Sequence, residues 1–250
     1  QANSVSESVE ATFGLSPFIT GIIIAVLTGL VIIGGIKNIG RVTEKLVPAM
    51  AIMYIIGSLI AIFSNVSMIP TVFKMIFANA FTAQAVGGGL LGTVIRFGIA
   101  RGVFSNEAGL GSAPRAHAAS KNEDPMVEGI NASLGVFIDT IIICTMTALV
   151  ILTSGLVSIE SNGAMVIEGN LKGATLTTAA FHTLLPGVGG YIISVGLIFF
   201  AFSTILGWYY YGSKCVEYIA GLKAVNYYSW AWIILTFVGA TTSLETLCNI

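Results

Sequence analysis

Long apolar segments separated by short polar stretches dominate the hydrophobic pattern of this chain. A helix that crosses a lipid bilayer needs about 20 mostly apolar residues. Five uninterrupted segments meet this requirement: residues 18–36, 46–64, 130–154, 189–213 and 227–247. A sixth, residues 90–120, is interrupted after residue 103 and resumes at 113–120. The pattern predicts an all-α, polytopic membrane helix bundle in one transmembrane domain, residues 1–250, with one broken helix and no β-sheet.

Two further stretches are too short or too polar to span a bilayer. Residues 70–85 begin with Pro70 and mix Lys74 and Gln84 with bulky apolar residues, which predicts a short amphipathic helix on one membrane surface. Residues 155–188 are polar and rich in glycine. We expect an extended loop there with short helices, one of them around residues 175–185.

The interruption in the sixth apolar segment carries the most chemical information. Three polar residues, two glycines and a proline follow one another there: Ser105, Asn106, Glu107, Gly109, Gly111 and Pro114. A broken helix in a bilayer frees backbone amides and carbonyls, which only protein or a watery cavity can satisfy. Such a break indicates a binding site in transporters. The alternative is an ordinary loop between two helices.

Composition supports a membrane protein. Hydrophobic residues make up 55% of the chain, and charged residues only 9%, against roughly 25% in soluble domains. The mean hydropathy is +0.90. A net charge of -1 gives no electrostatic reason to expect a nucleic-acid partner. Because the chain starts at Gln1 and stops within an apolar region, we interpret it as an internal piece of a longer membrane protein.

The distribution of Lys and Arg predicts the orientation, because loops enriched in these residues stay in the cytoplasm. If the spans alternate, one side receives these residues: Lys37, Arg41, Lys45, Arg115, Lys121, Lys214 and Lys223. The other side receives only Lys74 and Lys172, while Arg96 and Arg101 remain on the outer half of the broken helix. We therefore expect residues 1–17, 65–89 and 155–188 to face outward.

The sequence FSNEAGLGSAP at 104–114, preceded by RG, resembles the signature of the alanine or glycine:cation symporter family, which are sodium-coupled amino-acid carriers. Further similar stretches are QANS, GGIKNIGRVTEKLVP, VFIDTIIICTMTALVILTSG and FAFSTILGWYYYG, so the resemblance covers essentially the whole chain. It implies part of a leucine-transporter-type fold, built from two inverted five-helix repeats. In that register the spans resemble helices four to nine, and the broken helix is the sixth.

The resemblance makes the break the candidate substrate site. Gly109 and Gly111 would let the backbone approach a ligand closely. Phe104 would close one wall of a small pocket, and Ser105 and Asn106 would offer side-chain hydrogen bonds. Alternatively, Phe104 only packs in the core, and the two polar residues only cap the second half-helix.

Other candidate ligands lie outside the break. The resemblance places Ser203 and Thr204 at a sodium site between the eighth helix and the first, although both hydroxyls could instead bond their own helix. Trp208, one turn beyond Thr204, either lines the pocket or anchors the helix near the membrane interface. Gln1 is a candidate for bonding polar groups of the substrate, or is a surface residue.

Two carboxylates lie within apolar surroundings, where they are costly and by default functional. We expect Glu107 to bond backbone N–H groups freed by the break. We expect Asp139 to face the bundle interior and pair with a hydroxyl or a backbone group. The alternatives for Glu107 are sensing protons and pairing with Arg101, and the alternative for Asp139 is a proton or cation role.

The resulting functional hypothesis is sodium-coupled symport of a small neutral amino acid, alanine or glycine, by alternating access in the cell (plasma) membrane. Sodium is the coupling ion, no other cofactor is expected, and the partners are the amino acid, sodium and the lipid bilayer. An enzyme is not expected, because His117 and His182 fall on opposite sides of the membrane in this topology and cannot form a dyad. The alternatives are an intramembrane enzyme, a proton-coupled amino-acid carrier and a channel.

Overall fold

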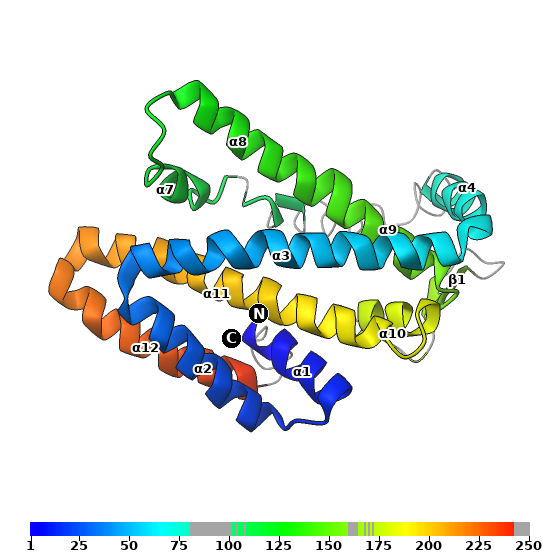
Figure 1. Ribbon diagram of the computed structural model, residues 1–250, viewed down its shortest axis with the longest axis horizontal. Helices are drawn as coiled ribbons and strands as arrows, with labels where there is room; N and C mark the ends of the chain where they lie inside the picture. The colour runs from blue at the N-terminus through cyan, green and yellow to red at the C-terminus, as the bar shows by residue number, and fades with distance from the viewer. Residues whose placement is uncertain are drawn as a thin grey trace, which may run out of the picture. The chain divides into compact units, whose positions relative to one another are not determined.

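The computed structural model describes residues 1–80, 102–103, 105–107, 109–159, 165–167, 169, 171 and 173–242 (Figure 1). Helices dominate these residues. The chain forms two compact units. Unit 1 comprises Gln1–Gly57 and Lys172–Ile250, and unit 2 comprises Ser58–Leu171.

Unit 1 is a bundle of helices: α1 (Ala2–Phe13), α2 (Pro17–Ile33), most of α3 (Gly35–Ser64), α10 (Ala174–Leu184), α11 (Gly189–Ala220) and α12 (Leu222–Thr241). In this unit α2 packs along α12, and α1 packs against α2, α11 and α12 (Figure 1).

Local sequence explains the boundary between α1 and α2. Gly14 ends α1 in the left-handed conformation with φ 68°, which favours glycine. Pro17 starts α2, where its missing N–H is not needed.

Small residues allow the close approach of α2 and α12. Gly21, Ala25 and Gly29 recur every fourth residue of α2 and therefore share one face of the helix. A Cβ atom on Gly21 would lie 3.2 Å from the Cβ of Ala240, and one on Gly29 would lie 3.2 Å from the Cδ1 of Ile233. Membrane helices commonly associate through small residues in this way, because contact between backbones replaces a hydrophobic driving force that lipid cannot supply.

Replacing Gly21 by Leu should therefore destabilise the protein, because the new side chain would force α2 away from α12. We expect a loss of about 1–3 kcal/mol, the usual cost of overpacking. The measurement is thermal unfolding of the full-length protein in detergent. Gly40→Leu is the control, since a Cβ atom at exposed Gly40 meets open space. Equal unfolding temperatures for the two variants would contradict this packing.

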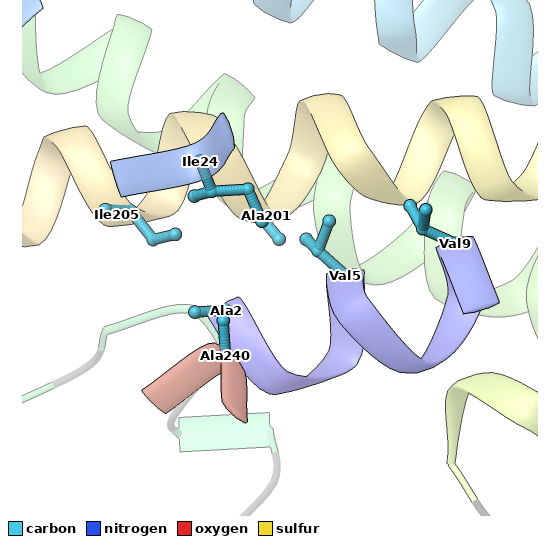
Figure 2. Close-up of a cluster of buried hydrophobic side chains, with 7 residues drawn as sticks. All are labelled: Ala2, Val5, Val9, Ile24, Ala201, Ile205 and Ala240. Atoms are coloured by element: carbon cyan, nitrogen blue, oxygen red, sulfur yellow. The ribbon is translucent and has the colours of Figure 1, made fainter. Parts of the chain in front are cut away.

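The core of unit 1 lies where α1 meets α2, α11 and α12. Figure 2 shows the buried side chains of this cluster: Ala2, Val5, Val9, Ile24, Ala201, Ile205 and Ala240. Polar residues of α1 are also buried there. Ser6 Oγ donates a hydrogen bond of 2.6 Å to the carbonyl of Ala240, and Asn3 Nδ2 donates one of 2.9 Å to the carbonyl of Thr242. Helix α1 was not predicted from the sequence, because its hydroxyl and amide groups are typical of a polar loop.

Unit 2 contains the last turns of α3 and a series of mostly short elements: η1 (Val66–Met68), α4 (Ile69–Ala80), α7 (Ala113–His117), α8 (Pro125–Phe137), the π-helix η2 (Ile138–Cys144), α9 (Thr145–Thr153), β1 (Val157–Ile159) and β2 (Met165–Ile167). The helices α8, η2 and α9 follow one another without an intervening loop. Helix α4 packs against α9, and Asn65 Nδ2 donates to the carbonyl of Thr153 at 2.9 Å. Helix α4 covers most of the predicted amphipathic segment.

The expected absence of a sheet was wrong. Strands β1 and β2 pair antiparallel, with Val157 opposite Ile167 and Ser158 opposite Val166. They lie in the segment that we expected to be an extended loop, where three apolar or hydroxyl residues on each side suffice for a short hairpin. The helix expected around residues 175–185 is present as α10.

The all-α membrane helix bundle is confirmed. Among the described residues, three helices are long and apolar enough to cross a bilayer: Lys37–Ser64, Pro125–Thr153 and Gly189–Ala220. They contain the predicted spans 46–64 and 189–213 in full and the span 130–154 up to residue 153, whereas the span at 18–36 corresponds to the shorter apolar helix α2. The last predicted span corresponds to α12, although residues 243–247 lie outside the described residues. The protein is therefore a multi-pass membrane protein.

Two details differ from the predicted spans. Helix α3 begins at Gly35, so Lys37, Arg41 and Lys45 lie on its first turns rather than in a loop. The positive φ of Gly35, 71°, allows α2 and α3 to follow each other with a single intervening residue. The first half of the broken helix, at residues 90–101, lies outside the described residues.

Candidate functional site

The described residues of the break do not form a continuous helix. The Asn106 N–H donates to the carbonyl of Gly102 at 3.1 Å, as in a helix, but the next backbone bond is a turn, from the Leu110 N–H to the carbonyl of Glu107 at 3.3 Å. Left-handed backbone follows, with φ of 53° at Glu107, 76° at Gly109 and 71° at Gly111. The chain returns to helix at α7, so the predicted interruption is present.

The π-helix of unit 2 holds the first polar residues of the break. Ser105 Oγ donates to Asp139 Oδ2 at 2.6 Å, and Thr140 Oγ1 donates to Asn106 Oδ1 at 2.8 Å. Asp139 and Thr140 both belong to η2. The expected pairing of Asp139 with a hydroxyl group is thus present. Single π-helical turns inside α-helices are rare and frequently occur at functional sites.

Glu107 has a different partner from the one we expected. Its Oε2 accepts a hydrogen bond of 2.6 Å from Ser112 Oγ, where we expected freed backbone amides. Ser112 is buried, with 3% of its surface exposed. This bond joins the two ends of the left-handed stretch. The bond supports the structural role that we expected for Glu107, but the donor is a hydroxyl group and not a backbone amide.

The two glycines of the break border open space. A Cβ atom built on either Gly109 or Gly111 would meet no atom within 4 Å, and both residues are exposed in the structure. A ligand could therefore approach their backbone amides and carbonyls. Phe104, the predicted wall of the pocket, lies outside the described residues.

The candidate sodium ligands lie on α11. Ser203 Oγ donates to the carbonyl of Phe200 at 2.8 Å, and Thr204 Oγ1 donates to the same carbonyl at 2.9 Å. The alternative arrangement, with both hydroxyls bonded to their own helix, is therefore present. It is compatible with cation binding, because a hydroxyl oxygen that donates its proton keeps two lone pairs. Both side chains are half-buried.

Helical geometry shows which side of α11 carries the Ser203 hydroxyl. Ala201 and Ile205 point into the core cluster with α1 (Figure 2). At 3.6 residues per turn, Ser203 lies about 200° around the helix from Ala201, and therefore on the opposite side. The Ser203 hydroxyl is thus not part of the packing between α1 and α11.

The remaining candidates also belong to unit 1. Trp208 is half-buried one turn beyond Thr204, and its ring makes an edge contact with Tyr211 at a centroid distance of 5.8 Å. Gln1 is exposed at the start of α1, and its carbonyl accepts a hydrogen bond from the Val5 N–H at 3.1 Å. The structure thus brings Ser203, Thr204 and Trp208 together on one helix. It brings Ser105 and Asn106 together with the π-helix.

Sequence reasoning missed two features of unit 2. One is the role of Thr140, which the adjacent polar pair in FIDTIII could have indicated. The other is a cluster around the Glu128 carboxylate, which lies near three donors: His117 Nδ1 at 2.6 Å, Ser120 Oγ at 2.8 Å and Asn122 Nδ2 at 2.8 Å. This cluster ties α7 to the first turn of α8. Within the described ranges, no three His, Cys, Asp or Glu residues could together hold a metal ion.

The chain matches one protein-family model and several known proteins over most or all of its length. The model of the sodium:alanine symporter family matches residues 1–250. The chain is 46% identical over its whole length to the sodium/alanine symporter AgcS of Methanococcus maripaludis and covers 54% of that protein. It is 36% identical to a sodium/proton-dependent alanine carrier protein of Bacillus sp. PS3, with 88% of this chain and 50% of the relative aligned. It is 35% identical to the probable sodium/glutamine symporter GlnT of Bacillus subtilis, with 88% and 44% aligned.

The chain therefore spans about half the length of the curated relatives it matches. All three carry the names of carriers or symporters and none is named as an enzyme. The family match extends over all of the residues that form the break, the π-helix and the hydroxyl pair of α11. The chain belongs to the sodium:alanine symporter family.

Proposed function

We propose that the full-length protein is a sodium-coupled symporter of a small neutral amino acid, alanine or glycine, in the plasma membrane. The observation that carries this proposal is the break at residues 105–112, where polar side chains and exposed glycine backbone lie together within a membrane helix bundle. The names of the relatives support it, because two of the three are called alanine carriers or symporters.

The chemistry of the break suits a zwitterion. An amino acid presents a carboxylate and an ammonium group, and both need partners once water is removed. The hydroxyl of Ser105 and the amide of Asn106 supply side-chain partners, while Gly109 and Gly111 supply accessible backbone. We assign these four residues to substrate binding, with Phe104 as a wall, and we keep Trp208 and Gln1 as further candidates.

Sodium prefers oxygen ligands, as other hard cations do. We assign Ser203 and Thr204 to sodium because their adjacent, half-buried hydroxyls lie within the apolar stretch 197–208 of α11. The carbonyl of Phe200, which both hydroxyls contact, keeps their orientation fixed before an ion arrives. Sodium would then bind to oxygens that are already positioned.

Alternating access supplies the mechanism. In transporters with inverted repeats, one bundle of helices rocks against another around a fixed site. The resemblance to a leucine-transporter-type fold, with the chain forming helices four to nine, supports this mechanism. Unit 1 carries the sodium candidates and unit 2 carries the break.

Uptake by the full-length protein in sealed vesicles tests the proposal. We expect accumulation of labelled alanine or glycine when sodium is higher outside than inside, and no accumulation when choline replaces sodium or an ionophore dissipates the gradient. A protein that equilibrates alanine without accumulating it, or that ignores sodium, would contradict symport.

A proton-coupled carrier is the second candidate, because one relative is named as sodium/proton-dependent. The same vesicles distinguish the two. An inward proton gradient without sodium should drive alanine accumulation only if protons can replace sodium. We expect no accumulation under that condition.

A further inference from the structure

The π-helix η2 presents two consecutive side chains to two consecutive residues of the break. Asp139 pairs with Ser105, and Thr140 pairs with Asn106. In an α-helix, successive side chains diverge by about 100° and do not share a face. A π-helix has a wider turn, so this angle is somewhat smaller there. Asp139 and Thr140 make both bonds from within the π-helical residues 138–144.

Asp139 determines which hydrogen-bonding role Ser105 can play. A carboxylate oxygen accepts hydrogen bonds, and a hydroxyl group has one proton to donate. The Ser105 hydroxyl therefore donates its single proton to Asp139 Oδ2, at 2.6 Å. Its two lone pairs remain and point away from Asp139. Ser105 is exposed, so this oxygen is available to a ligand as an acceptor.

Thr140 has the opposite effect on Asn106. A carboxamide group has an acceptor end, the oxygen, and a donor end, the NH2 group. The Thr140 hydroxyl donates to Asn106 Oδ1 at 2.8 Å, which directs the acceptor end toward η2. The Nδ2 group is then the end of the amide that faces away from Thr140. It is a donor, which suits a carboxylate.

We infer that Asp139 and Thr140 preset the polarity of the substrate site, making Ser105 an acceptor for the substrate's ammonium group and Asn106 a donor for its carboxylate. This inference rests on the proposed function, since it names the residues that select a zwitterion at the same site. Asp139 and Thr140 do not touch the substrate. They are positioning residues, which act through Ser105 and Asn106.

The first test concerns Thr140 and uses equilibrium binding of labelled alanine to the full-length protein. Thr140→Val keeps the shape of the side chain but removes the donor, so the Asn106 amide can turn over. We expect a rise in Kd of about two- to tenfold, the effect of losing one hydrogen bond. Thr140→Ser should restore the wild-type Kd. In an Asn106→Ala background, Thr140→Val should have no further effect.

The second test concerns Asp139. Asp139→Asn is nearly isosteric, but its NH2 group can donate to Ser105 and so reverse the hydroxyl. We again expect a rise in Kd of about two- to tenfold, which should disappear in a Ser105→Ala background. Ser133→Ala is the control, because the Ser133 hydroxyl lies on α8 and donates to its own helix, at the carbonyl of Gly129. Its Kd should equal that of the wild type.

The outcomes separate this inference from the proposed function. Additive effects on the Kd in both double mutants would overturn the inference, and so would a Thr140→Ser variant whose Kd is as high as that of Thr140→Val. In either case, binding of alanine by the wild-type protein would still support the proposed function. A wild-type protein that binds none of the small neutral amino acids would refute the proposed function, and the inference with it. Thermal unfolding is measured on every variant and identifies any rise in Kd that results from misfolding.

Discussion

Replacing Gly109 by Leu should abolish alanine binding by the full-length protein while the protein still inserts and folds. The Gly109 Cβ position borders open space at the break, so a leucine side chain would fill the volume that we assign to the substrate. It would also oppose the left-handed φ of 76°, at a cost of about 1–2 kcal/mol. Equilibrium binding of labelled alanine, with thermal unfolding measured in parallel, checks both effects.

Gly155→Leu is a matched control for this strain. Gly155 has a φ of 79°, is exposed, and has no atom within 4 Å of its Cβ position, but it follows α9, outside the break. Both variants should lose similar stability, and only Gly109→Leu should lose alanine binding. Unchanged alanine binding in Gly109→Leu would move the substrate away from the break. Equal loss of binding in both would mean that backbone strain, rather than occupation of the site, explains the effect.

The second large effect should come from the hydroxyl pair on α11. Thr204→Val keeps the side-chain shape and removes an oxygen, and Ser203→Ala removes the neighbouring one. Because a polar contact with a charged group, such as a hydrogen bond, is worth about 1.5–3 kcal/mol, we expect each change to raise the sodium concentration for half-maximal alanine uptake by about tenfold or more. The measurement is alanine uptake into vesicles across a series of external sodium concentrations.

Thr236→Val is the control for the sodium experiment. Thr236 Oγ1 donates to the carbonyl of Trp232 at 2.8 Å, the same bond to the preceding helical turn that Thr204 makes. If Thr204 and Ser203 only stabilise their own helix, all three substitutions should leave the sodium dependence unchanged. That result would remove both residues from the sodium site.

The length of the apolar runs made the membrane bundle predictable, because each bilayer-spanning helix needs a long apolar segment whatever its neighbours are. The break was predictable for a related reason. Ser105, Asn106 and Glu107 followed by Gly109 are costly in a continuous membrane helix, so their occurrence together indicated a local exception. Both predictions rest on residues that are adjacent in the sequence.

Features that depend on distant partners could not be predicted in this way. The burial of α1 relies on Ser6 bonding the carbonyl of Ala240, 234 residues away, and nothing near Ser6 reveals that acceptor. Likewise, the local sequence FIDTIIIC does not predict a π-helix. The hydrogen bonds of Asp139 and Thr140 to the break join residues 34 positions apart. Pairing across such separations is a property of the folded chain.

The most direct measurement for this account is the affinity for alanine as a function of sodium concentration, and the affinity for sodium as a function of alanine, on the full-length protein. Two ligands that stabilise the same state must strengthen each other's binding by the same factor. We predict that sodium lowers the Kd of alanine and that alanine lowers the Kd of sodium equally. An alanine Kd that is the same in sodium and in choline would contradict a sodium-coupled site in this protein.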